Sequence, residues 1–152
     1  MPGVGGENGS TAVDSMDTFR KGEVDLRSTN QVDNTSLRST QGADWTDADQ
    51  QKLMIMVEEE GLDYVEEQRL KQDKTSVYTG YLDRSNKRKG WGRKVFKNGD
   101  KYEGEWSNDK ANGKGRYEHA DGDVYKGFWK DDKAHGYGLY TSSSGSSYLG
   151  DW

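Results

Sequence analysis

The sequence predicts a mainly β protein in which tandem antiparallel β-hairpin repeats form an elongated, curved sheet, preceded by a helix and an irregular N-terminal tail. Two observations lead to this fold class. A short aromatic and glycine motif recurs in the second half of the chain, where 14 of the 17 aromatic residues and 13 of the 20 glycines fall within residues 77–152. Only 30% of the 152 residues are apolar and 32% are charged, so one conventional core spanning the whole chain is not expected.

Three sequence elements repeat in phase. Tyr-x-Gly-x-Trp-like motifs occur at Tyr-to-Tyr spacings of 24, 23 and 23 residues, as Tyr78-x-Gly80-x-Leu82, Tyr102-x-Gly104-x-Trp106, Tyr125-x-Gly127-x-Trp129 and Tyr148-x-Gly150-x-Trp152. A Gly-x-Gly pair follows each of the first three, at Gly90 and Gly92, Gly113 and Gly115, and Gly136 and Gly138. A turn then follows at a fixed distance, at Asn98-Gly99, Asp121-Gly122 and Ser144-Gly145. Such a period indicates stacked units with a continuous core, here 78–101, 102–124, 125–147 and a partial unit 148–152.

The spacing within each motif predicts how a unit folds. Residues at i, i+2 and i+4 of a strand share one face, so Tyr102, Gly104 and Trp106 should point together while Glu103 and Glu105 point away. Asn-Gly and Asp-Gly favour two-residue hairpin turns with positive φ, so each unit should contribute two short antiparallel strands. The glycines should leave room for aromatic rings of neighbouring strands to lie over the backbone.

These units resemble the MORN (membrane occupation and recognition nexus) repeat, whose pattern is roughly Tyr-x-Gly-x-Trp, a polar stretch, Gly-x-Gly-x-Tyr and then Asp-Gly. The resemblance covers residues 77–152 and implies a row of β-hairpins in one antiparallel sheet. The first unit departs from the pattern, because Leu82 replaces Trp, Lys94 stands where later units have Tyr117 and Tyr140, and its loop has one extra residue. We interpret the first unit as an atypical capping repeat.

The N-terminal residues 1–44 predict a disordered or extended polar tail. They are rich in Gly, Ser, Thr, Asn and Asp, and their isolated apolar residues follow no helical or strand period. A short echo, in which Leu26-Arg27-Ser28-Thr29 returns as Leu37-Arg38-Ser39-Thr40, is either low complexity or a pair of docking or phosphorylation sites.

Residues 45–76 are predicted to form an acidic amphipathic helix and a linker. Thr46 followed by Asp49 resembles a capping box at the start of the helix. Gly61 is expected to divide the helix into two parts, 47–60 and 62–72.

Residues 77–101 form a basic island, with eight basic and two acidic side chains in a chain whose net charge is −5. Its members are the candidate binding residues for an anionic partner: Arg84, Lys87, Arg88, Lys89, Trp91, Arg93, Lys94 and Lys97. Near an anionic membrane each Lys or Arg contributes about 1 kcal/mol, and Trp91 would insert at the interface. The same charges suit acidic protein tails and, as the least favoured partner, nucleic acid. The alternative is that the island pairs with the acidic cluster at residues 58–67 of the same chain.

The sequence offers no catalytic, cofactor-binding or metal-binding site. Without cysteines, disulfides, thiol chemistry and Cys-based metal sites are excluded. His135 is interpreted as a hairpin-loop residue, and His119, beside Glu118 and Asp121, is only a weak metal candidate. None of the common nucleotide-binding, zinc-protease or hydrolase motifs occurs, so we expect no cofactor and no enzymatic activity.

The resemblance implies a non-enzymatic scaffold that joins partners within a large assembly, with a cytoskeletal or ciliary (axonemal) one favoured. One alternative is a peripheral module that binds anionic, phosphoinositide-containing membranes through the basic island, and another is the N-terminal regulatory fragment of a larger MORN-containing enzyme. The last unit stops at Trp152 after one strand, so a partner strand or a second copy is expected to cover that edge. No apolar run approaches the about 18 residues of a membrane span, and no signal pattern is present, so we expect a cytoplasmic, cytoskeleton- or cilium-associated protein.

Overall fold

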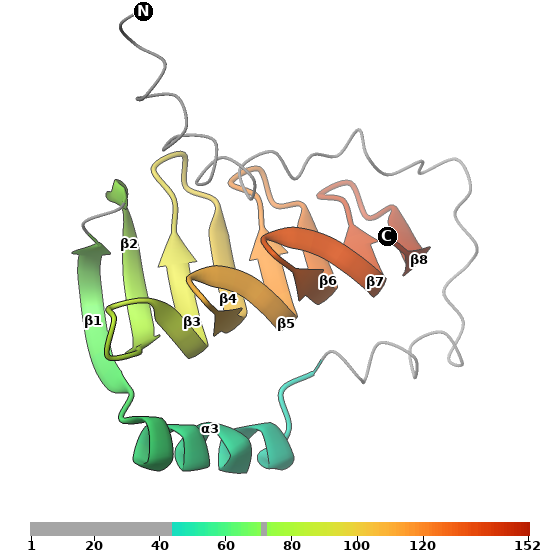
Figure 1. Ribbon diagram of the computed structural model, residues 1–152. Helices are drawn as coiled ribbons and strands as arrows, with labels where there is room; N and C mark the ends of the chain where they lie inside the picture. Colours follow the sequence, from blue (N-terminus) through green and yellow to red (C-terminus); the bar gives the residue numbers. More distant parts are fainter. Residues whose placement is uncertain (1–43, 71–72) are drawn as a thin grey trace, which may run out of the picture.

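The computed structural model describes residues 44–70 and 73–152, which form one helix followed by eight strands (Figure 1). The elements are α3 (Asp47–Glu60), β1 (Asp63–Leu70), β2 (Asp73–Leu82), β3 (Arg88–Val95), β4 (Lys101–Ser107), β5 (Lys110–Glu118), β6 (Val124–Lys130), β7 (Lys133–Thr141) and β8 (Ser147–Asp151). Each strand pairs antiparallel with the next, so the eight strands form one open, uncurled sheet in chain order. This confirms the predicted mainly β class and the tandem hairpins.

A row of glycines crosses the sheet from β2 to β8. Neighbouring strands meet glycine to glycine along Gly80, Gly92, Gly104, Gly115, Gly127, Gly138 and Gly150. A Cβ atom added to Gly115 would lie 2.5 Å from the ring of Tyr102, and one added to Gly104 would lie 2.6 Å from the hydroxyl of the same tyrosine. The tyrosine ring therefore lies over the paired glycines, as the sequence predicts.

Each motif tryptophan joins two successive repeats. The Trp129 ring packs edge-on against Tyr102 and Tyr125, at centroid distances of 5.1 and 5.2 Å, and its Nε1 donates to the Gly115 carbonyl over 3.1 Å. Trp106 makes the equivalent contacts one repeat earlier. Each aromatic pair contributes about 0.5–1.5 kcal/mol beyond its buried area. The core is thus a continuous row of aromatic rings on one face of the sheet. We call this face the aromatic face.

The turns differ from the prediction in length. At the Asn-Gly turn, the Phe96 N–H donates to the Asp100 carbonyl and the Gly99 N–H to the Phe96 carbonyl, which leaves three loop residues. Gly99 has φ +92°, as expected for a type I turn with a glycine bulge rather than a two-residue turn. Two-residue turns with positive φ at both positions lie instead at the opposite ends of the strands, at Asn108-Asp109 and Asp131-Asp132.

Helix α3 confirms the first part of the predicted helix and corrects the rest. Thr46 and Asp49 form the predicted capping box, and Gly61, at φ +67°, ends the helix. Residues 62–72 were predicted to be helical, but Asp63–Leu70 form β1, which pairs with β2, and residues 71 and 72 lie outside the described residues. Because Val65 packs against the aromatic core in this pairing, tertiary contacts outweigh the helical propensity of the Glu, Gln and Arg residues around it.

The sheet does not begin at the first repeat. Strand β1 extends it on the N-terminal side of β2, so the first repeat, residues 78–101, does not form the edge of the sheet. The predicted polar tail at residues 1–44 lies outside the described residues except for Asp44, which lies on the sheet.

Candidate functional site

The residues of the basic island do not share one surface. Because β3 alternates between the two faces of the sheet, Arg88 and Lys94 are buried on the aromatic face, with 8% and 3% of their surface exposed. The intervening residues of the strand point to the opposite face: Lys89, Trp91 and Arg93. The others lie in the turns at the two ends of β3: Arg84, Lys87 and Lys97. The period-two pattern already carried this signal, but the prediction treated the charges as one patch.

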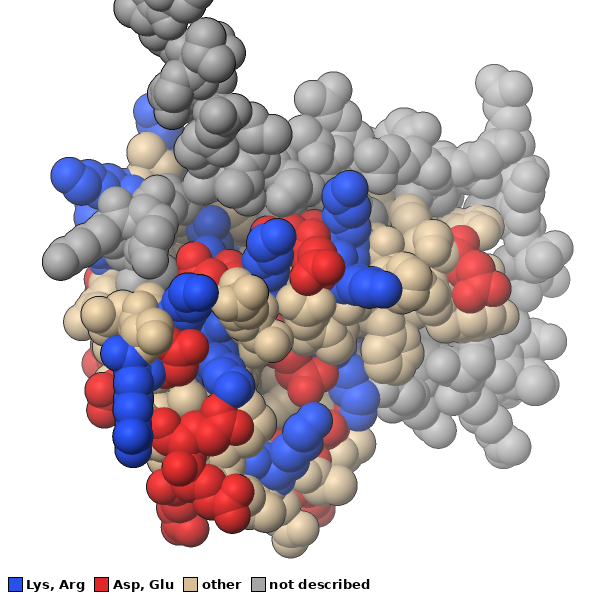
Figure 2. Space-filling model, in the orientation of Figure 1, with Lys and Arg blue, Asp and Glu red and all other residues tan. Residues whose placement is uncertain are grey.

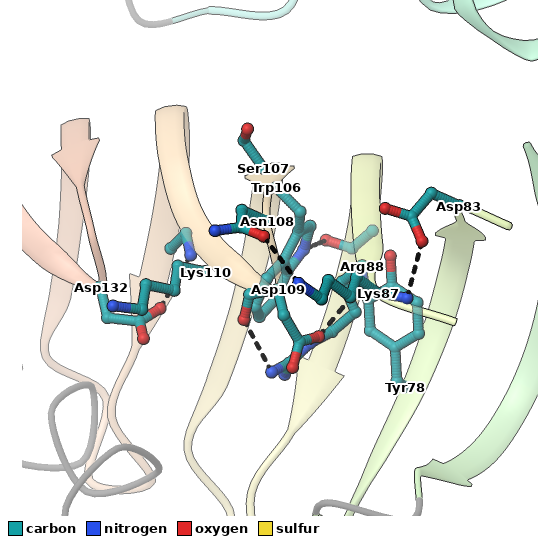
Figure 3. Close-up of polar contacts among 12 residues, drawn as sticks. Tyr78, Asp83, Lys87, Arg88, Trp106, Ser107, Asn108, Asp109, Lys110 and Asp132 are labelled. Carbon is teal, nitrogen blue, oxygen red and sulfur yellow. Dashed lines mark hydrogen bonds and ion pairs between the residues drawn. The ribbon is translucent and has the colours of Figure 1, made fainter. Parts of the chain in front are cut away.

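Arg88 is held in an ion pair within the core (Figure 3). Its Nε lies 2.6 Å from Oδ1 of Asp109, and its Nη2 donates to the backbone carbonyl of Asp109 over 2.9 Å. Its guanidinium lies 4.4 Å from the centroid of the Trp106 ring. With its polar atoms engaged inside the protein, Arg88 serves the packing of the repeat rather than a partner.

Lys94 and Asp132 also place charge on the aromatic face. The Lys94 ammonium lies 4.5 Å from the centroid of the Phe96 ring. Burial raises the pKa of Asp132, although its Oδ1 accepts the Ala111 N–H over 2.7 Å and the charges of Arg88 and Lys94 oppose the shift. These side chains are part of the core, so two members of the predicted anionic site, Arg88 and Lys94, lie where an outside partner does not reach.

Two residues of the basic island outside the core contact the N-terminal helix and the residue just before its cap. Lys89 forms an ion pair with Glu60 at the end of α3, and the Trp91 ring lies 4.2 Å from that of Trp45. Arg93 is exposed. Figure 2 shows basic and acidic side chains interleaved over the described part of this view. The pairing alternative thus holds at Lys89, while binding of an anionic partner by the exposed residues stays a prediction.

The chain from residue 44 to residue 60 lies across the face opposite the aromatic core. We call this segment, which ends in α3, the strap, and the face beneath it the strap face. Lys114 Nζ on β5 lies 2.9 Å from Oδ2 of Asp49 and 3.2 Å from the Asp44 carbonyl, while Lys126 on β6 pairs with the Asp44 carboxylate. The sequence reasoning missed this arrangement, because no local pattern links residue 44 with residue 126.

A pocket of about 450 Å³ opens between the strap and β3 to β5. Apolar side chains line part of it, including Trp45, Leu53 and Met56, and charged side chains such as Lys52, Glu60 and Lys89 line the rest. A second pocket of about 210 Å³ lies between Trp45, Trp91, Arg116 and Lys126. Both are bounded by the strap, so its position determines their shape.

Buried aspartates fasten each repeat to the next. The Tyr117 hydroxyl donates to Oδ2 of Asp100 over 2.7 Å, and Oδ1 of Asp100 accepts the Ala120 N–H. Tyr140 and Asp123 repeat the contact one unit later. Neither Asp100 nor Asp123 was identified from the sequence. The Asp-to-Asp spacing of 23 residues is the signal that could have identified both.

The two histidines lie in different settings. His119 Nδ1 lies 3.4 Å from Oδ2 of Asp100, within the tyrosine–aspartate fastening. His135 is exposed in β7 and not in a hairpin loop as predicted. Within residues 44–70 and 73–152, no group of three His, Cys, Asp or Glu side chains is placed to hold a metal ion.

The repeated geometry agrees with a comparison to known families. The MORN repeat family model matches residues 102–124 and 125–147, so these two segments are MORN repeats. No curated protein matches the chain. MORN repeats occur in scaffold and membrane-binding proteins and are generally non-catalytic. No helix in the described part of the chain is long and apolar enough to cross a membrane.

Proposed function

We propose that this protein is a non-enzymatic scaffold that joins other proteins within a large assembly. The observation that carries the proposal is the unbroken row of paired glycines from β2 to β8, which is covered by tyrosine rings and bridged between repeats by tryptophans. Each repeat adds two strands, or about 9.6 Å, to a single-layered sheet, so side chains on its faces recur at fixed distances. A stiff surface of this kind suits the positioning of partners.

The favoured setting is a cytoskeletal or ciliary (axonemal) assembly. It is supported by the association of MORN repeats with protein and membrane interactions and by the tyrosine–aspartate contacts that link successive repeats at Asp100 and Asp123. A sheet so cross-linked along its length resists bending between its partners.

Extraction of the native protein tests the scaffold. We expect release only on disassembly of a large structure, with the chain in a particle far above 17.1 kDa on sizing. Release by high salt from membranes as a small species would overturn the scaffold proposal. Detergent without salt serves as the control that separates membrane enclosure from electrostatic attachment.

A second function, binding to anionic membranes, is favoured by the exposed members of the basic island: Arg84, Lys87, Arg93 and Lys97. The triple variant K87E/R93E/K97E should lose flotation with phosphoinositide-containing vesicles. The variant K110E/K130E/K133E changes the net charge equally at exposed sites outside the island and should retain flotation. Equal behaviour of the two variants would show that the island has no specific role.

A further inference from the structure

We propose that the strap face binds an acidic peptide in which an aromatic residue is flanked by carboxylates, and that residues 44–49 occupy this site within the chain. The inference rests on the scaffold function, because it specifies the chemistry of one partner that the array would join. It is carried by the contacts of the strap and by the surface that continues beyond them.

The bound segment shows what the site recognises. Trp45 packs on Trp91, at a centroid distance of 4.2 Å and an interplanar angle of 51°. The carboxylate before it, Asp44, pairs with Lys126, and the one four residues after it, Asp49, lies 2.9 Å from Lys114 Nζ. One aromatic contact and two lysines on neighbouring strands therefore define a site for an acidic, aromatic segment.

Few buried apolar side chains hold the strap to the sheet. In α3 only Leu53 is buried, whereas Met54 and Ile55 are 45% and 52% exposed. The Asp44–Lys126 pair is open to solvent, with 49% and 38% of the two side chains exposed, and exposed pairs contribute about 0–1 kcal/mol. A partner with the same charges and a larger apolar contact could therefore replace residues 44–49.

The strap face supplies such a contact beyond the strap. Lys126 is paired across the sheet with Leu139, and Leu139 with Leu149, so two leucines follow the lysine on one row. Phe128 and Tyr137 lie on the same face of β6 and β7, and 43% of Tyr137 is exposed. An outside peptide can engage the lysines and then this apolar row, which residues 44–49 do not cover.

The test measures binding of a fluorescein-labelled synthetic peptide of residues 42–52, GADWTDADQQK, to the purified full chain. The variant D44N/W45A should bind the peptide about tenfold more tightly than the wild type, because a tethered competitor at millimolar effective concentration has been weakened. The variant leaves Thr46 and Asp49, and hence the helix cap, unchanged. Adding K114E/K126E should abolish binding, whereas adding K110E/K130E should not.

Two further measurements keep the result interpretable. The single variant D44N, at an exposed side chain, should show a smaller gain in the same direction, and far-UV circular dichroism checks that both variants retain the sheet. A control peptide with Trp replaced by Ala should bind more weakly. Equal peptide affinity of wild type and both strap variants would overturn the inference.

The inference and the scaffold function fail in different ways. Peptide binding that depends on Lys114 and Lys126 supports the inference even if native extraction yields a small particle, in which case the scaffold proposal alone is lost. A large native particle with no gain in peptide binding on strap release overturns the inference and leaves the scaffold standing.

Discussion

The first repeat, residues 78–101, and the two MORN repeats, residues 102–147, have the same strand pairing but differ in the side chains at several equivalent positions. Both carry the tyrosine over paired glycines, and Tyr78 donates to the Tyr81 carbonyl as Tyr102 does to that of Glu105. The first repeat, however, has other residues at positions where the MORN repeats have Trp, Ala and Tyr, namely Leu82, Arg88 and Lys94.

The difference shows which positions define the repeat. The aspartate of the turn is kept, since Asp109 accepts the Arg88 N–H just as Asp132 accepts the Ala111 N–H. In the first repeat the same carboxylate also binds the Arg88 side chain, so the backbone contact is combined with an ion pair. The first Tyr and the paired Gly positions fix the fold, while the Ala position tolerates a charge where a partner is already present.

Loss of a motif tryptophan should have the largest effect. Trp129→Ala removes a buried ring that contacts two repeats and should lower the free energy of unfolding by about 4 kcal/mol, measured by urea denaturation. Leu82→Ala, at the equivalent position of the first repeat, should cost about 2 kcal/mol because its side chain is smaller. Equal losses would mean that the first repeat depends on this position as strongly as the MORN repeats do.

Asp109 and Asp132, which occupy equivalent turn positions, should respond differently to replacement by alanine. Asp109→Ala leaves the Arg88 guanidinium buried without its carboxylate and should cost about 3 kcal/mol in urea denaturation. Asp132→Ala removes the acceptor of the Ala111 backbone N–H and should cost about 1 kcal/mol. The variant Arg88→Ala, which restores the MORN pattern, should be milder than Asp109→Ala, and the reverse order would contradict the ion pair as the reason.

Substitutions in the glycine row should destabilise the first repeat and the MORN repeats by similar amounts. Gly115→Ala pushes a methyl group into the Tyr102 ring and should cost about 2 kcal/mol, and Gly92→Ala should do the same against Tyr78. Gly136→Ala meets no atom within 4 Å but has φ +69°, so about 1 kcal/mol is expected from backbone strain alone. Chemical denaturation of the three variants separates the two causes, and a tolerated Gly92→Ala would show that the first repeat packs its tyrosine differently.

Much of the sheet could be predicted because its rules are local. Period two within Tyr102-x-Gly104-x-Trp106 placed these side chains on one face, and the 23-residue period fixed the order of the hairpins. The same rules also identified the departures at Leu82 and Lys94. The turn prediction failed in detail because Asn98-Gly99 fits both turn lengths, and the hydrogen bonding of the flanking residues decides between them.

The parts that were missed depend on contacts far apart in the chain. Strand β1 exists because Val65 pairs opposite Gly80, although its own sequence favours a helix as much as a strand. The position of the strap involves the ion pair between Asp44 and Lys126, and no local sequence pattern links two residues so far apart in the chain. The basic island was misread as one patch because charge was counted along the chain, while burial of Arg88 depends on Asp109 in the next repeat.

The smallest effect concerns the strap, whose Asp49 carboxylate is tuned by the MORN repeat beneath it. The hydrogen bond from Lys114, together with those from Thr46, lowers the pKa of Asp49 from 3.8 to about 2. Because the pKa in the folded protein is below that of the unfolded chain, the contribution of Asp49 to stability is present above about pH 4 and is lost as the pH falls toward 2. Carbon-13 NMR titration of the carboxyl group should show the low pKa in the wild type and a rise toward 3.8 in Lys114→Met. The matched variant Lys110→Met should leave the pKa unchanged, whereas an unchanged value in Lys114→Met would show that the helix cap alone sets it and that the strap is not bound through Lys114.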